Sequence, residues 1–176
     1  MPGRATATTM ADMTAQRDLD EQNAAVARRL IDENAYLVLG TAGPDGVPWT
    51  TPVYYAPDGY ARFYWISSPD ARHSRNLAGR PEVSIVVFDS TVPIGAARAV
   101  YMSARAQQVP DDELEGCLEV AFQPRFPGIK PFGVAELTAP APFRLYRADV
   151  TEHSILIRGG DPVQGTGADS RVLVRP

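Results

Sequence analysis

The hydrophobic positions of this chain fall into short, β-prone runs that are separated by clusters of glycine, proline and aspartate. Runs of this length with turn residues between them are typical of antiparallel β-structure. Three of them stand close together, at Tyr36–Thr41, Val47–Tyr55 and Ala61–Ile66. The tight turns that join these runs predict a three-stranded meander. Because proline has no N–H to donate to a β-ladder, Pro48 and Pro52 are expected on an edge strand or at a bulge.

Further runs predict five more strands, at Glu82–Phe88, Arg98–Val109, Phe143–Val150, His153–Arg158 and Arg171–Val174. Helical periodicity predicts helices at Leu19–Glu33, directly after Ser68, and at Asp111–Phe122, with one short helical piece within Gln123–Pro142. Strands dominate this order, so the pattern predicts a mainly β, α+β fold. We expect a closed or partly closed antiparallel barrel of six or more strands with peripheral helices.

The two ends of the chain differ from this pattern. Residues 1–17 are small and polar without apolar periodicity, which predicts a disordered or loosely attached N-terminal arm. Residues 18–176 suit a single globular domain. The glycine-rich stretch Gly159–Gly167 does not lead from a strand into a helix. We therefore interpret it as a flexible loop rather than as a nucleotide-binding turn.

The composition of the chain argues against several classes of binding partner. The formal net charge is −4 over 176 residues, which argues against a nucleic-acid partner. The single cysteine, Cys117, cannot form an internal disulfide. The sequence shows neither an apolar run of about 18 residues nor a secretory signal pattern, so we expect a cytoplasmic protein without membrane contact. A local cationic site in an acidic protein would suit a small anionic molecule.

The stretch Phe63–Leu77 changes from an aromatic strand to a helix at two hydroxyl residues, Ser67 and Ser68. Ser68 is a good N-cap, so the free N–H groups of the helix are expected to face this turn. Arg72 and His73 follow at once. Hydroxyl groups, free helix N–H groups and cations together predict an anion site, most simply for phosphate. The alternative is a solvated surface on which the arginines pair with neighbouring carboxylates.

A second candidate lies in the middle of the second predicted strand, where hydroxyl and apolar side chains alternate: Trp49, Thr50, Thr51, Pro52 and Val53. On an edge strand, such a run can hydrogen-bond the rim of a flat heterocycle. The alternative is a half-buried strand whose threonines only reflect β-propensity.

Motifs for catalysis by the protein alone are sparse. The sequence has no G-x-S-x-G motif, and Cys117 beside Leu118 in a predicted helix suits a core position. The two histidines, His73 and His153, are far apart, and no metal-binding spacing occurs. If the protein performs a reaction, a cofactor is expected to carry the reactive atoms.

Four blocks occur in a fixed order: GTAGPDGVPWTTPVYY, FYWISSPDARHSRNL, RPEVSIVVF and ARAVYMSARAQQV. In this order they resemble the pyridoxamine 5′-phosphate oxidase-like family of flavin-binding split β-barrels. The resemblance is clear over about Ala35–Val109 and looser at FRLYRADV. It implies a split barrel that forms a homodimer with FMN at the subunit interface. The implied contacts are Thr50, Thr51, Pro52 and Val53 for the ring, Trp65, Ile66 and Ser67 for the ribityl chain, and Arg72 and His73 for the phosphate.

The chain departs from the true oxidases of that family at several positions. Thr51 stands where their second strand carries arginine, and His73 stands in place of the lysine of their basic pair. Their ring-contacting glutamine has no counterpart near Ala99 and Val100, and their C-terminal Trp and Arg pattern is absent. We therefore expect an FMN-binding oxidoreductase whose small-molecule substrate is not pyridoxamine phosphate. Two alternatives stay open, an F420-dependent reductase of the same fold and a flavin- or haem-binding protein without turnover.

Overall fold

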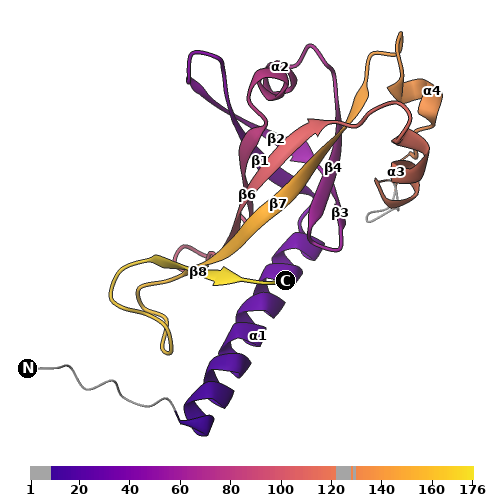
Figure 1. The fold of residues 1–176 in the computed structure, drawn as a ribbon. Helices are drawn as coiled ribbons and strands as arrows, with labels where there is room; N and C mark the ends of the chain where they lie inside the picture. Colours follow the sequence, from indigo (N-terminus) through magenta and orange to yellow (C-terminus); the bar gives the residue numbers. More distant parts are fainter. Residues whose placement is uncertain (1–8, 122–127, 129) are drawn as a thin grey trace, which may run out of the picture.

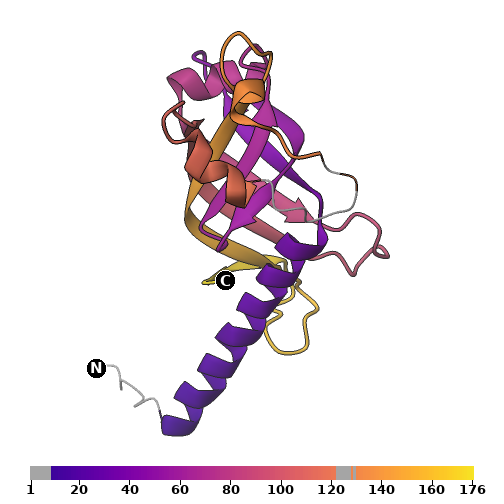
Figure 2. The ribbon, with the colours of Figure 1, turned by 90° about the vertical axis from the view of Figure 1, so that its right-hand side faces the viewer.

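The structure, a computed structural model, describes residues 9–121, 128 and 130–176. Its centre is a curled antiparallel sheet in the order β2-β1-β5-β6-β7-β4-β3, and β8 pairs with β7 outside this path. The strands are β1 (Tyr36–Ala42), β2 (Pro48–Tyr54), β3 (Ala56–Asp58), β4 (Arg62–Ser67), β5 (Glu82–Phe88), β6 (Ala99–Gln108), β7 (Arg144–Ile157) and β8 (Ser170–Val174). Figures 1 and 2 show the sheet wrapped into an incompletely closed barrel with helices around it. The predicted antiparallel, α+β split barrel is confirmed.

The barrel is open along β2. This strand hydrogen-bonds to β1 on one side only, and its other side faces β4 without a ladder in the described residues. Pro48 and Pro52 both lie in β2, so their predicted edge position is confirmed. Unpaired backbone groups on an edge strand are available for a ligand or another chain. The split in the sheet is therefore where the fold offers a binding edge.

The side chains of β4 divide the core into two parts. Phe63 and Trp65 point into the barrel and belong to its main apolar core, together with Ile85 and Leu39. Tyr64 points to the other face, where a second, smaller core lies beneath α3 and α4. The alternation of side chains along a strand explains this division. One strand thus connects the barrel interior with the outer helical layer.

The helix α1 (Met10–Glu33) is longer than predicted. A capping box begins it, since Thr9 Oγ1 accepts from the Asp12 N–H and the Asp12 carboxylate accepts from the Thr9 N–H. The helix therefore extends through residues 10–17, which were predicted as part of a disordered or loosely attached arm, while residues 1–8 lie outside the described part of the chain. Residues 10–18 are all exposed, and this half of α1 projects away from the barrel (Figures 1 and 2). Capping, rather than an apolar face, marks the start of this helix.

The helix α2 (Arg72–Gly79) follows β4 after a turn. Its N-cap is Ala71 and not Ser68, so the predicted cap is wrong. Ser68 instead stabilises the preceding turn, because its Oγ accepts from the Asp70 N–H at 3.1 Å and its carbonyl accepts from the Ala71 N–H at 3.1 Å. Figure 1 places α2 at the end of the barrel opposite to the projecting half of α1.

Two short helices cover the outer face of β4 and β7. They are α3 (Leu114–Ala121) and α4 (Val134–Leu137). The predicted helix start at Asp111 is wrong because residues 111–113 form a turn. The predicted end at Phe122 lies outside the described residues. Cys117 is 9% exposed and packs in the small core, as predicted for a structural cysteine.

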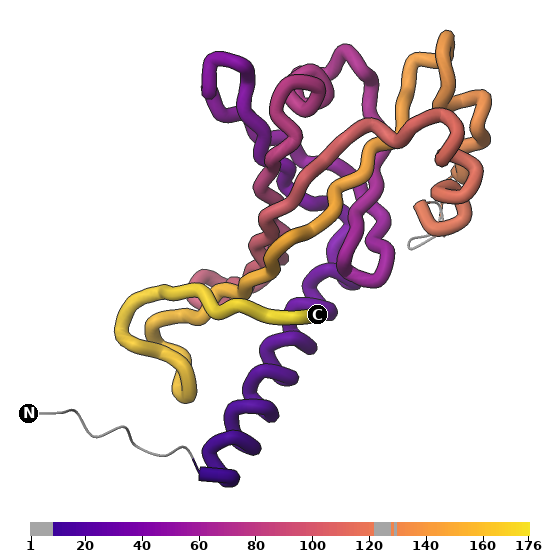
Figure 3. Tube along the Cα trace, in the orientation of Figure 1, coloured from indigo at the N-terminus to yellow at the C-terminus, as the bar shows by residue number. Residues whose placement is uncertain are grey.

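The strand β7 is continuous where two strands were predicted, and Figure 3 shows it running along the whole barrel. The polar pair Thr151–Glu152 suggested a break. It instead lies opposite a register shift between Ser103 and Ala104 of β6, and Thr151 Oγ1 donates to the Ser103 carbonyl at 3.0 Å. A bulge lets polar residues continue in a strand without ending it.

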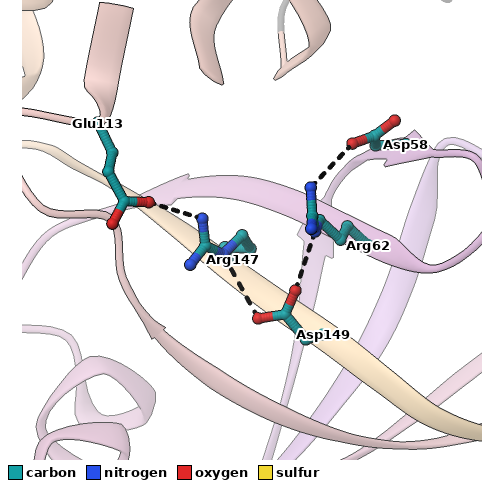
Figure 4. A network of polar contacts seen from close by, with 5 residues as sticks. All are labelled: Asp58, Arg62, Glu113, Arg147 and Asp149. Atoms are coloured by element: carbon teal, nitrogen blue, oxygen red, sulfur yellow. Dashed lines mark hydrogen bonds and ion pairs between the residues drawn. The ribbon is translucent and has the colours of Figure 1, made fainter. Parts of the chain in front are cut away.

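Ion pairs tie the outer face of β7 to its neighbours (Figure 4). Asp149 accepts from Arg62 of β4 at 3.1 Å and lies 3.4 Å from Arg147 Nε. Arg147 also donates to Glu113, just before α3, at 2.8 Å. Because Arg62 and Asp149 are about half exposed, at 51% and 49% of their side chains, these contacts align the elements more than they stabilise them.

None of the helices in the described ranges is both long and apolar enough to cross a lipid bilayer.

Candidate functional site

A cleft of about 520 Å³ lies along the split between β2 and β4, and we call it the β2–β4 cleft. Seven of the eleven predicted site residues line it: Thr51, Pro52, Val53, Trp65, Ile66, Ser67 and His73. They come from β2, β4 and α2, which are the three elements expected to hold one cofactor. Two larger hollows, of about 1050 and 850 Å³, lie along α1 and contain none of the predicted residues.

The other four predicted residues, Trp49, Thr50, Ser68 and Arg72, do not line this cleft. Two of them are joined to each other, since the Arg72 guanidinium stands 4.5 Å above the Trp49 ring. This cation–π contact connects the start of β2 to the first turn of α2. Arg72 is exposed, so its N–H groups can turn toward an anion at the helix start. Ser68 is committed to the turn before the helix.

Ser67 and His73 form the polar end of the cleft. Ser67 Oγ and His73 Nε2 are 2.7 Å apart, although six residues separate them in sequence. His73 is 6% exposed, and burial lowers the pKa of its imidazole. His73 is thus a buried, neutral side chain at pH 7 and not the partly charged surface group that its sequence neighbours suggest.

Buried hydrogen bonds fix the position of α2 relative to β1 and β2. Asn76 Nδ2 donates to Thr41 Oγ1 of β1 at 3.0 Å, and Thr41 Oγ1 donates to the Trp49 carbonyl of β2 at 3.3 Å. Both side chains are 5% exposed. A buried polar chain of this kind holds three elements in one register. It therefore sets the distance between the start of α2 and the edge strand β2.

Replacing Asn76 by alanine is expected to destabilise the protein by about 1–3 kcal/mol, because the buried Thr41 hydroxyl on β1 loses the hydrogen bond that it accepts from Asn76. Urea unfolding followed by circular dichroism measures this loss. The double variant T41V/N76L removes the polar atoms of both side chains and should recover part of the loss. A change below about 0.5 kcal/mol for Asn76→Ala would contradict the role of this bond.

One buried donor in the cleft wall lacks a partner. Trp65 is 2% exposed and stacks on Tyr146 with ring centroids 5.8 Å apart, yet its indole Nε1–H has no hydrogen-bond partner among the residues that the structure describes. Buried donors are nearly always paired, so this N–H is unusual, but it is sealed from solvent. Ser67 in the cleft and the exposed Arg72 in the first turn of α2 are the groups that fit the phosphate of a cofactor.

Sequence reasoning missed the outer wall of the cleft. Ala121 at the end of α3, together with Lys130 and Phe132, closes the side that faces away from the barrel. Tyr36 and Tyr54, whose rings meet edge to face at 6.3 Å, stand at the far end from Ser67. Their pairing in the β1–β2 register forms this aromatic end, as the first hairpin of the predicted meander implies. The rest of the predicted three-stranded meander is wrong, because β2 and β4 form no ladder in the described residues and β4 pairs with β3 and β7. The wall from α3 had no sequence signal, because it depends on how the helix packs.

The fold resembles solved structures with several ligands. The haem storage protein HutZ of Vibrio cholerae is 25% identical with a TM-score of 0.57, over 70% of this chain and 87% of that one. An FAD-binding protein of Mesorhizobium loti is 20% identical with a TM-score of 0.57, over 75% and 92%. An F420 reductase is 21% identical with a TM-score of 0.52, over 72% and 94%. No curated protein matches the sequence significantly.

A family model described as pyridoxamine 5′-phosphate oxidase matches residues 24–154. This range contains the sheet from β1 to most of β7, the helices α2, α3 and α4, and all of the predicted site residues. The predicted family resemblance is therefore confirmed, and the chain belongs to the pyridoxamine 5′-phosphate oxidase family.

Proposed function

We propose that this protein is an FMN-binding oxidoreductase that holds the flavin in the β2–β4 cleft. The observation that carries the proposal is the meeting of the predicted ring-binding strand, the predicted ribityl-binding strand and Ser67–His73 in one cleft. FMN would supply hydride transfer at its ring system. The protein would supply the edge of β2 for the ring, Ser67 and Arg72 for the phosphate, and an apolar wall that excludes water.

The charge of the cleft favours FMN over F420, whose acidic tail needs a broad basic groove. Of the arginines considered for such a groove, Arg75 donates to the Asp70 carbonyl, Arg80 donates to the Pro44 carbonyl and Arg105 pairs with Glu82. Arg98 lies beside a different hollow. Within the described ranges, the cations left near the cleft are Arg72, Lys130 and Arg144, which lies opposite Ser67 on β7. Lys130 pairs with Glu136, and Arg144 donates to the Ala141 and Phe143 carbonyls.

The histidines give little support to a haem-binding function. Histidine, through a ring nitrogen, is a common protein ligand of haem iron, beside cysteine, methionine and tyrosine. His73 Nε2 contacts Ser67 Oγ, and His153 Nε2 contacts the Tyr60 carbonyl at 3.0 Å. Both Nε2 atoms are therefore engaged inside the protein, so haem ligation through either would break an existing contact.

Titration of the purified, flavin-free protein with FMN, F420 and haemin tests the cofactor. We expect saturable binding of FMN at one molecule per chain, and a yellow complex that releases flavin on denaturation. Uptake of F420 or haemin without uptake of FMN would contradict the proposal. Oxidation or reduction of the bound flavin by candidate substrates then separates an enzyme from a binding protein.

We also propose that the protein is a homodimer with the cleft at the subunit interface. Support comes from large apolar side chains exposed on β1, β2 and β5, namely Tyr36 at 62%, Trp49 at 39% and Phe88 at 43%. Tyr36 and Phe88 lie at neighbouring ends of the paired strands β1 and β5, and exposed apolar side chains that lie together are typical of interaction surfaces. Light scattering should give twice the chain mass of 19.1 kDa, and a monomer at micromolar concentration would contradict the dimer.

A further inference from the structure

His73 occupies a position where a lysine would supply a fixed positive charge, but its environment suits a different role. The side chain is 6% exposed, and burial alone accounts for the lowered pKa of its imidazole. The charged groups around it are Asp70 and Arg72 beside the start of α2, Arg144 opposite Ser67 on β7, and Lys130 in the cleft wall. A neutral imidazole among them adds no charge to the site.

The contact between His73 and Ser67 decides what Ser67 can offer to a ligand. A serine hydroxyl has one proton to donate. If Ser67 donated this proton to His73 Nε2, only its lone pairs would face the cleft, and they would repel an anion. If Nε2 carries the proton and donates to Ser67 Oγ, the hydroxyl proton remains free for a ligand oxygen. At 2.7 Å the two atoms are close enough for either hydrogen bond.

We propose that His73 is a positioning residue whose Nε2–H donates to Ser67 Oγ and thereby directs the Ser67 hydroxyl proton at a phosphate oxygen of the bound cofactor. This inference rests on the FMN function proposed above. In this arrangement Arg72 supplies the positive charge, and the Ser67–His73 pair supplies a directional hydrogen bond from the polar end of the cleft. His73 thus orients the Ser67 hydroxyl group, where a lysine would supply a positive charge.

Two conservative variants of His73 separate orientation from packing. The amide of His73→Gln places an N–H donor near the position of Nε2, whereas the amide of His73→Asn lies near the position of Nδ1 and does not reach Ser67. We expect His73→Gln to bind FMN within about threefold of the native protein. We expect His73→Asn and His73→Leu to bind FMN about tenfold more weakly, the effect of one hydrogen bond to a charged group.

Riboflavin, which lacks the phosphate, provides the internal control. Each His73 variant should bind riboflavin as the native protein does, because the proposed effect acts only on the phosphate. Ser67→Ala should show the same selective loss for FMN. In the Ser67→Ala background, His73→Leu should cause no further loss, since His73 acts through the Ser67 hydroxyl. Equal losses for FMN and riboflavin would show a structural role and overturn the proposal.

The pH profile distinguishes a positioning residue from a cation. If His73 stays neutral in the complex, the FMN dissociation constant should be nearly constant from pH 7 to 9, where the phosphate is a dianion. If the phosphate instead protonates His73, its pKa is higher in the complex than in the free protein. Between the pKa of His73 in the free protein and its pKa in the complex, the FMN dissociation constant would then rise by up to tenfold per pH unit. Such a rise, absent in His73→Gln, would overturn the proposal.

These experiments distinguish a failure of the proposed FMN function from a failure of the proposed role of His73. If the native protein binds neither FMN nor riboflavin, the proposed function fails. If it binds both but His73→Asn and His73→Gln bind FMN equally well, the function stands and the positioning role is wrong. Thermal unfolding of each variant confirms that the measured protein is folded.

Discussion

Replacing Arg72 by alanine should weaken FMN binding by about 1.5–3 kcal/mol, or roughly 10- to 150-fold, while riboflavin binding changes little. Arg72 is the first residue of α2, so its guanidinium lies at the start of the helix. A charge-assisted hydrogen bond from a guanidinium to phosphate is among the stronger polar contacts. Its exposed side chain rests over Trp49, which holds it near the start of the helix. Isothermal titration with FMN and with riboflavin measures the two affinities.

Arg75→Ala is the matched control for this prediction. Arg75 lies on the same helix and is also exposed, but its guanidinium donates to the Asp70 carbonyl. Its removal should change FMN affinity by less than about threefold, the size of a screened long-range charge effect. Equal effects of the two variants would show that general charge, and not a specific contact by Arg72, attracts the phosphate.

Replacing Phe63 by alanine should destabilise the fold by about 3–5 kcal/mol, the largest stability effect that we predict. Phe63 is fully buried in the barrel, packs on Tyr55 with ring centroids 5.5 Å apart and lies opposite Ala148 of β7. Neither neighbouring strand can collapse into the space without losing its register. Chemical denaturation measures this loss of stability. We expect a lower midpoint concentration of denaturant and an unchanged dependence of the unfolding free energy on denaturant concentration.

Phe143→Ala provides the comparison for this core substitution. Phe143 stands just before β7, is 42% exposed and meets Phe132 edge to face. Because much of its surface is already in water, we expect a loss below about 1.5 kcal/mol. If Phe63→Ala costs no more than Phe143→Ala, the barrel core is not packed around Phe63 as described.

The strands could be predicted from sequence where burial alone decides the pattern. β5 has the predicted bounds because its apolar run is bordered by Pro81 and Asp89. The predictions failed where local and tertiary signals compete. Ser68 looks like a helix cap, but the chain needs an additional turn before α2 can dock on β1 through Asn76. Sequence cannot show how much chain a turn uses when the docking contact decides it.

The candidate site was predictable in its parts but not in its electrostatics. Edge prolines predicted the position of β2, and the hydroxyl turn predicted an anion site. The cleft contains residues from both predictions. The charge of His73 depends on which way its side chain turns. Next to Arg72 and Arg75 it looks like part of a cationic surface, yet its contact with Ser67 places it in the interior. Burial is a tertiary property that neighbours in sequence do not determine.

A crystal structure of the protein with FMN would locate the flavin. We expect the ring against Thr51–Val53, and a phosphate oxygen within about 3.2 Å of both Ser67 Oγ and the Arg72 guanidinium. Flavin density in one of the hollows along α1, with the β2–β4 cleft empty, would contradict this expectation.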